Sequence, residues 1–405
     1  MKRKIKIAFV FPLNLKEGGS TKLFFQFIKY LPKDKFDLTF VDTNYQVNKS
    51  LSDLDLSGIL KGVGYKTIDS IDKKFKFIEL WNTDMSRFAK AMSIVFFYFL
   101  ETLIAPIYCR YRNDKNTLSG YDFLYFVRNT DVRHFPLDKK TFALGSTHLI
   151  GLGFRGLKGD IFAKFYGFLT RRLEGIHYFT ESYRQTSKVN KKKDLVLPNG
   201  IEGVTVSDGL LEPSGRAKFL SVGRLEPSKG ILEMLEAFES VILRDIELHI
   251  CGTGNLDDVV QKTARIDERI TYHGYVSEKE LHSLYQICDF FILPTHGETF
   301  GLTAIEALSH GLYVLASSDL FNVGTAEVYQ QFVRKDMMTL IELSSNNLKK
   351  KVEYLSENVS IYREKRKAHI GDIRALTSRY EWKDLIREFN EWVEERVQEK
   401  GTSID

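Results

Sequence analysis

The chain has 405 residues, enough for two domains of ordinary size, and its 43% hydrophobic and 27% charged residues describe a soluble globular protein. The three cysteines, Cys109, Cys251 and Cys288, are too few and too far apart for a disulfide framework or a cysteine-based metal cluster, and they favour a reducing compartment. Residues 1–6 are basic, and the apolar run that follows them is short and alternates with lysine, which predicts a first strand rather than a signal peptide.

The formal net charge of +5 is the sum of two opposed halves. Residues 1–200 contain 34 Lys and Arg against 19 Asp and Glu, a balance of +15, so residues 201–405 contain 24 against 34, a balance of −10. We therefore expect the two halves to have different partners.

In the first half, the sequence predicts a strand at 4–11, a loop at 12–20 and an amphipathic helix at 21–30. Gly18 and Gly19 in that loop permit a close approach of the backbone to a ligand at the start of the helix, although an ordinary connecting turn accounts for them equally well. Further short apolar runs predict strands at 36–41, 121–127, 141–145, 176–179 and 195–197.

Two stretches of this half could meet a membrane surface. Residues 91–109 are strongly apolar, but Glu101 and Pro106 interrupt them, so they predict either a buried helix or a helix lying in a membrane surface. Residues 151–172 interleave aromatic side chains with lysine and arginine, which together with the +15 balance suits an anionic surface or a soluble anionic acceptor.

The second half alternates strands with helices, as in a doubly wound α/β domain with a parallel sheet. Gly252 and Gly254 follow one predicted strand but lack the complete dinucleotide fingerprint, which argues against an oxidoreductase. The predicted strands are 218–222, 247–251, 270–272, 290–293 and 313–316.

Arg224 and Lys229 flank the loop that follows the predicted strand 218–222. Two cations at the carboxyl end of a strand can hold a diphosphate, the arginine through its planar fork and the lysine as a point charge. The alternative is a pair of ordinary surface cations.

The stretch from Phe290 to Gly311 combines an apolar strand, a turn and a short helix. Residues 299–302 place free backbone N–H groups at the helix start, where a phosphate or sugar oxygen can bind. Glu306 stands among apolar neighbours in the helix, so its carboxylate needs a hydrogen-bond donor, which the hydroxyl groups of a ligand could supply.

The sequence Glu298-Thr-Phe-Gly-Leu, followed by Glu306-Ala-Leu and Gly311, resembles the signature of the retaining GT-B glycosyltransferases of the GT4 type. The resemblance implies an α/β, GT-B fold of two Rossmann-like, doubly wound domains facing a cleft. It covers the second half well and the first half in outline.

The resemblance also implies roles for individual residues. Glu298 would reach the donor sugar, Glu306 the ribose, and Arg224 and Lys229 the diphosphate, with His148 beside the reacting sugar unless it is a core histidine. The remaining donor-binding residues would be Gly18, Gly19, Tyr275, Val276, Thr299, Phe300, Gly301 and Leu302.

The domains expected from the resemblance are an N-terminal, acceptor-side domain at 1–205 and a nucleotide-sugar-binding domain at 206–382. A final helix from about 383 to 405 would cross back to the first domain.

The implied activity is transfer, with retention, of a hexose-type sugar from a nucleotide diphosphate sugar to a glycan or lipid-linked acceptor. We expect no cofactor and no metal, since no Asp-x-Asp pair stands in a predicted strand-end loop. We expect a cytoplasmic protein, either free or peripheral on the inner face of the membrane, that does not bind nucleic acid. The alternatives are an epimerase or phosphorylase on the same scaffold, or a non-enzymatic binding protein that uses its basic surface.

Overall fold

The computed structural model describes residues 3–11, 25–42, 63–67, 118–127, 132, 135, 137–146, 164, 166–168, 170–187, 189–202, 215–298, 300–319 and 326–401. The chain divides into two compact units. Unit 1 comprises residues 1–179, 184–198 and 383–405, and unit 2 comprises residues 180–183 and 199–382.

Unit 1 is built on a parallel sheet of seven strands in the order β3-β2-β1-β4-β5-β6-β7. The central strands β4 and β5 are buried at every position, which is why they read in the sequence as continuous apolar runs. The strands are β1 (Ile5–Phe11), β2 (Phe36–Asp42), β3 (Gly64–Thr67), β4 (Phe123–Phe126), β5 (Phe142–Ser146), β6 (Gly175–Tyr178) and β7 (Leu195–Val196).

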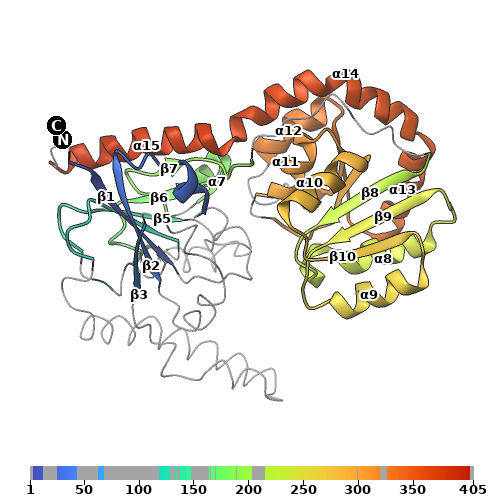
Figure 1. Cartoon of the computed structure of the whole chain (residues 1–405), viewed down its shortest axis with the longest axis horizontal. Coiled ribbons are helices and arrows are strands. Elements are labelled where there is room, and N and C mark those ends of the chain that lie inside the picture. Colours follow the sequence, from blue (N-terminus) through green and yellow to red (C-terminus); the bar gives the residue numbers. More distant parts are fainter. Residues whose placement is uncertain are drawn as a thin grey trace, which may run out of the picture. The chain divides into compact units, whose positions relative to one another are not determined.

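The last helix, α15 (Trp382–Glu399), lies against the sheet of unit 1 (Figure 1). The fully buried ring of Phe389 meets Phe27 edge-on at 4.6 Å and Phe123 at 6.0 Å between centroids. On the same helix, Glu394 forms an ion pair with Lys35, in which Lys35 Nζ lies 2.8 Å from Glu394 Oε1. An aromatic face and a charged rim thus fix this helix to unit 1.

Unit 2 is built on a parallel sheet of six strands in the order β10-β9-β8-β11-β12-β13. The strands are β8 (Ala217–Val222), β9 (Ile246–Cys251), β10 (Ile270–Gly274), β11 (Phe290–Leu293), β12 (Tyr313–Ser317) and β13 (Met338–Ile341). Counted in chain order this is 3-2-1-4-5-6, the doubly wound order, in which the chain reverses direction across the sheet between β8 and β11. Ligands of open α/β sheets bind at the carboxyl ends of the two strands that flank such a reversal.

Helices cover both faces of the sheet of unit 2 (Figure 1). One core joins the sheet to α8, α9 and α13 and is centred on Phe219, Phe238, Leu248, Phe290 and Val352. Helices α10 and α11 lie on the other face. The helices of this unit are α8 (Ile231–Ser240), α9 (Asp257–Ile266), α10 (Glu278–Ile287), α11 (Leu302–Ser309), α12 (Ala326–Arg334), α13 (Ser345–Glu357) and α14 (Val359–Thr377).

The start of β11 is fixed by a buried ion pair. Arg363 of α14 donates through Nε to Asp289 Oδ1 at 2.7 Å and through its terminal nitrogen to Oδ2 at 2.9 Å. Asp289 Oδ2 also accepts the backbone N–H of Lys218 at 3.0 Å. The carboxylate therefore aligns β8 and β11, the two strands at the reversal point.

We predict that Phe389→Ala lowers the free energy of unfolding of unit 1 by about 3–5 kcal/mol, because the truncation leaves a cavity among fully buried aromatic rings. Urea unfolding followed by circular dichroism measures this loss. Arg387→Ala is the matched control on the same helix, since its side chain is 68% exposed and pairs only at the surface with Asp384. Equal stability of Phe389→Ala and the control would contradict the assigned role of Phe389.

Candidate active site

Two loops meet at the carboxyl ends of β8 and β11, the loop of residues 223–230 and the loop of residues 294–301. The backbone N–H of His296 donates to the carbonyl of Ser228 at 3.0 Å. Gly230 has φ +65°, and a Cβ atom there would stand 1.6 Å from the carbonyl oxygen of Pro294. Only glycine permits this approach, so the backbone itself holds the loops together.

An ion pair joins the same two loops through their side chains. Lys229 Nζ donates to Glu298 Oε1 at 2.5 Å, and the side chains are 19% and 20% exposed. Lys229 ends a short 3₁₀ helix, Pro227–Lys229, that leads into α8. Two residues that are 69 positions apart, and that the sequence analysis singled out for separate roles, are thus in direct contact.

Arg224 lies in the same loop as Lys229 but pairs elsewhere. Its guanidinium donates to Glu226 Oε1 at 2.6 Å, and the arginine side chain is 55% exposed. The pair is local and open to water, so it contributes little to stability. Arg224 can therefore reorient toward an anion at a small cost.

The turn before α11 presents backbone donors. Gly301 has φ +74° and, as the N-cap residue, has no side chain that could accept from the first-turn N–H groups of α11. The buried hydroxyl of Tyr329 donates to the carbonyls of Phe300 at 2.9 Å and Gly301 at 2.7 Å. Burial holds the pKa of Tyr329 well above its usual value, so the hydroxyl stays a neutral donor.

Glu306 lies in the middle of α11, half-buried, with a tyrosine behind it. The hydroxyl of Tyr285, a buried residue of α10, donates to Glu306 Oε2 at 3.4 Å. Burial and the nearby carboxylate of Glu306 raise the pKa of Tyr285 well above its usual value. Tyr285 therefore remains protonated and orients the carboxylate.

His310 completes the support of Glu306. Its ring stacks on Tyr285 with centroids 4.6 Å apart, and its Nδ1 lies 2.8 Å from the backbone carbonyl of Glu306. A carbonyl only accepts, so Nδ1 carries the proton. Nε2 then accepts from Nδ1 of His282 at 2.8 Å. Sequence reasoning missed Tyr285, Tyr329 and His310, because their partners are backbone carbonyls or distant side chains.

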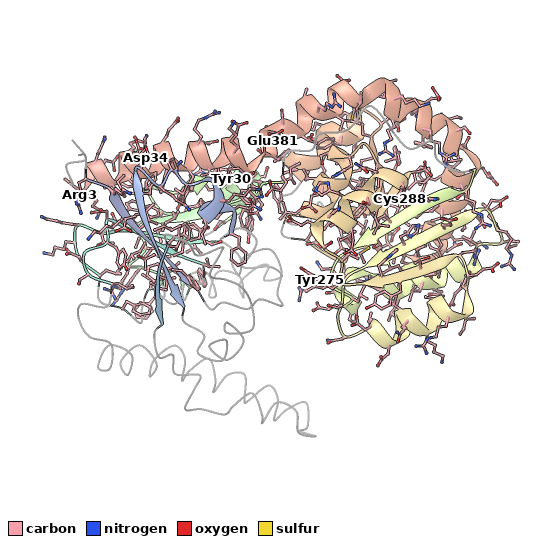
Figure 2. All side chains as sticks on the ribbon, viewed as in Figure 1. Arg3, Tyr30, Asp34, Tyr275, Cys288 and Glu381 are labelled. Atoms are coloured by element: carbon pink, nitrogen blue, oxygen red, sulfur yellow. The ribbon has the colours of Figure 1, made fainter. Side chains whose placement is uncertain are left out.

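The loop after β10 lies at the same edge of the sheet. Gly252 has φ +124°, its N–H donates to the carbonyl of Gly274 at 2.7 Å, and a Cβ on it would meet the Gly223 carbonyl at 1.8 Å. Tyr275, the next residue after β10, is 85% exposed, whereas Val276 is half-buried; Figure 2 shows Tyr275 at the surface of unit 2 and Cys288 inside it. An exposed aromatic ring at this edge suits a planar base.

Four predicted residues, Gly18, Gly19, His148 and Thr299, lie outside the described part of the chain. Their assigned roles stay predictions. Within the described ranges, no group of three or more His, Cys, Asp or Glu could hold a metal ion.

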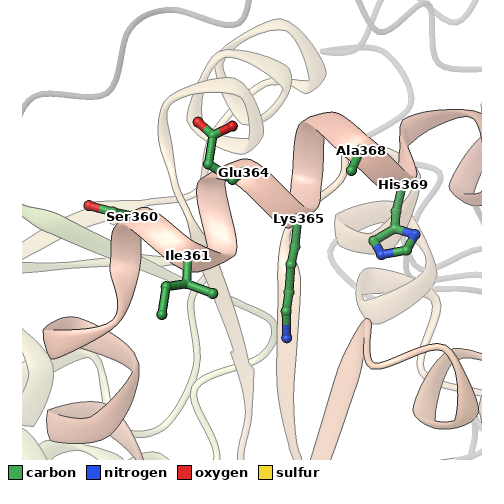
Figure 3. A pocket seen from close by; sticks show the side chains of 6 residues that line it. All are labelled: Ser360, Ile361, Glu364, Lys365, Ala368 and His369. Carbon is green, nitrogen blue, oxygen red and sulfur yellow. The ribbon is translucent and has the colours of Figure 1, made fainter.

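A separate hollow of about 590 Å³ lies on α14 and is lined by Ser360, Ile361, Glu364, Lys365, Ala368 and His369 (Figure 3). All six residues belong to one helix face, and none belongs to a strand-end loop. Lys365 forms an ion pair with Asp336, so the carboxylate already balances the charge of the lysine. The hollow is thus a shallow surface feature, separate from the strand-end site.

A comparison with known protein families covers the part of the chain that carries the strand-end loops. Residues 206–369 match the model of the family described as Glycosyl transferases group 1. This part of the chain is thus similar to the group 1 glycosyl transferases. The match spans β8 to most of α14 and includes both strand-end loops.

Two curated relatives are similar over shorter stretches. Mannosylfructose-phosphate synthase of Agrobacterium fabrum is 30% identical over 105 residues, which cover 23% of each chain. Phosphatidyl-myo-inositol mannosyltransferase of Mycobacterium tuberculosis is 31% identical over 130 residues, 30% of this chain and 34% of the relative. The chain thus matches about a third or less of the length of these relatives.

Solved structures are similar over almost the whole chain. TarM has a TM-score of 0.68 at 13% identity and covers 97% of this chain and 99% of its own. HepE of Anabaena, solved in complex with UDP, has a TM-score of 0.66 at 14% identity and covers 96% of this chain and 100% of its own. At this identity the likeness shows the fold, and it confirms the α/β, GT-B prediction.

We predict that the stability of unit 2 falls as the pH drops from about 6.5 to 4. Burial lowers the pKa of His310 from 6.5 to about 4, assisted by the neighbouring His282 and Arg366, so the unfolded chain binds a proton that the folded one does not. Stability is then fully present above pH 6.5 and falls by up to roughly 3 kcal/mol near pH 4.

Urea unfolding at pH 7 and pH 4.5 tests this dependence. His310→Gln should flatten it, whereas His369→Gln, at a histidine that is 42% exposed on α14, should retain it. An unchanged pH dependence in His310→Gln would show that other groups are responsible.

Proposed function

We propose that the protein is a retaining glycosyltransferase that moves a hexose-type sugar from a nucleoside diphosphate sugar to a glycan or lipid-linked acceptor. The observation that carries the proposal is the Lys229–Glu298 contact at the strand-order reversal of unit 2. It places a cation and a carboxylate together where α/β sheets bind nucleotides. The family match supports the reaction class.

Relatives with known ligands support the donor and acceptor classes. HepE was solved with UDP-glucose, and TarM of S. aureus was solved with UDP and α-GlcNAc-glycerol. Two of the curated relatives are named as a mannosyltransferase and a mannosylfructose-phosphate synthase. Retention follows from the resemblance of the Glu298 to Gly311 stretch to retaining enzymes of the GT4 type.

The residues would divide the donor between them. Lys229 and Arg224 would hold the diphosphate, together with the N–H groups that begin α11. Glu298 would accept from the sugar hydroxyls and Glu306 from the ribose, while the Tyr275–Val276 segment would meet the base. Gly18, Gly19 and Thr299 would add backbone contacts, and His148 would lie beside the sugar.

Departure of the diphosphate builds negative charge as the bond to the sugar breaks. Fixed positive groups at that position stabilise the charge without having to reorganise during the reaction. Lys229 is already held at 19% exposure, in a site where water screens it only in part. This electrostatic stabilisation is the proposed basis of catalysis.

The proposal includes contact with a membrane surface only for the N-terminal, acceptor-side domain. Arg171 lies 4.8 Å over the ring of Phe168, which is 49% exposed, and Lys164 is also exposed. Arg172 instead donates to the carbonyl of Phe135 at 2.5 Å, so it stabilises the fold. Among the helices of the described residues, none is long and apolar enough to cross a membrane.

We predict that Arg224→Ala and Lys229→Ala each weaken binding of the nucleoside diphosphate and slow transfer about tenfold to a hundredfold, with the exposed Arg224 nearer the lower figure. Calorimetry with UDP, GDP and ADP, followed by assays with the matching sugar nucleotides, measures both effects. Lys262→Ala, an exposed cation of α9, is the control. Wild-type affinity in both variants would refute the diphosphate assignment.

We predict that transfer survives chelation. The single Asp-x-Asp of the chain, Asp53 and Asp55, follows neither β8 nor β11, and the diphosphate already has two cations. Turnover should be unchanged in EDTA. Complete loss of turnover that Mg²⁺ or Mn²⁺ restores would show that the reaction needs a metal.

A further inference from the structure

Both cations proposed to hold the diphosphate are already paired with carboxylates. Lys229 contacts Glu298 and Arg224 contacts Glu226. The two pairs differ mainly in the cation, because the Lys229 side chain is 19% exposed and the Arg224 side chain is 55% exposed, while the carboxylates of Glu298 and Glu226 are 20% and 28% exposed. Where an incoming phosphate oxygen takes the place of the carboxylate, it does so at Lys229 beside a cation shielded from most water, whereas Arg224 stays open to water.

The exchange does not require the loops to separate. Gly230 against the Pro294 carbonyl and the His296–Ser228 hydrogen bond hold the backbones together independently of the ion pair. Lys229 and Glu298 both have flexible stems beyond that backbone. Their charged ends can part while the loops stay in contact.

We infer that Glu298 is a specificity-determining residue that makes the site prefer the intact sugar nucleotide to the sugar-free nucleoside diphosphate. The inference rests on the proposed function. In the free protein, Glu298 occupies the position on Lys229 that a phosphate oxygen takes. When the diphosphate binds, the carboxylate loses its partner in a partly shielded site, which is unfavourable unless new donors reach it.

The two ligands differ in whether they supply those donors. The sugar of the intact donor offers hydroxyl groups at the position assigned to Glu298, and hydrogen bonds to a charged acceptor are among the stronger ones. The nucleoside diphosphate offers none there, so Glu298 competes with it for Lys229. After the sugar has left, the carboxylate returns to Lys229 and promotes release of the product.

The test compares Glu298→Gln with wild type by calorimetry against UDP, GDP and ADP and against UDP-glucose and GDP-mannose. The variant should bind the nucleoside diphosphate about three- to tenfold more tightly, because a neutral amide no longer competes for Lys229. It should not bind the sugar nucleotide more tightly. The preference for donor over product should therefore shrink, and product inhibition should strengthen.

Three controls separate this exchange from a general change in charge. Glu233→Gln removes a carboxylate of the same region that pairs with His296 rather than Lys229, so it should tighten diphosphate binding less. Glu298→Asp keeps the charge and should tighten it less than Glu298→Gln. In a Lys229→Gln background, Glu298→Gln should have no further effect on diphosphate affinity. Glu298→Ala gives the same test if the glutamine variant does not fold.

Two negative results have different meanings. If wild type binds sugar nucleotides but Glu298→Gln binds the nucleoside diphosphate no more tightly, the exchange is overturned and the proposed function stands. If wild type binds no nucleotide of the panel, the proposed function and the exchange are both overturned.

Discussion

The close approach of Gly230 to the carbonyl of Pro294 is the constraint on which the site depends. The reversal of strand order between β8 and β11 makes two strand-end loops neighbours, and a residue without Cβ brings their backbones into contact. Arg363 and Asp289 fix the opposite end of the same strands. With both ends fixed, Lys229 and Glu298 meet although the chain between them forms three strands and three helices.

Much of unit 2 follows from its apolar runs. The strand expected at 218–222 is Ala217–Val222, the one at 290–293 is Phe290–Leu293, and the short helix predicted before Gly311 is Leu302–Ser309. The two strands are predictable because both faces of a parallel strand are buried, so their residues form continuous apolar runs. The edge strand β13 was not predicted, since Met338–Ile341 is only partly buried and its residues lack that signal.

The site was predictable in its residue types and only partly in its contacts. Spacing and the family resemblance singled out Lys229 and Glu298, but neither indicates that the two form an ion pair in the free protein. Tyr285, Tyr329 and His310 gave no signal, because a tyrosine on the apolar face of an amphipathic helix reads as core and a backbone acceptor leaves no trace in the sequence. Such contacts depend on tertiary packing, which local patterns do not encode.

The two carboxylates of α11 and its preceding turn show how environment separates chemically identical groups. Glu298 forms an ion pair with Lys229, so a ligand that takes the place of either side chain competes with a charged partner. Glu306 faces a tyrosine that stays protonated, and the adjacent His310, with its pKa lowered to about 4, remains neutral near pH 7. A neutral hydroxyl donor orients a carboxylate without pairing it with a positive charge. In the proposed roles, Glu298 is thus suited to exchange its partner when the sugar binds, and Glu306 is suited to accept hydrogen bonds from the ribose.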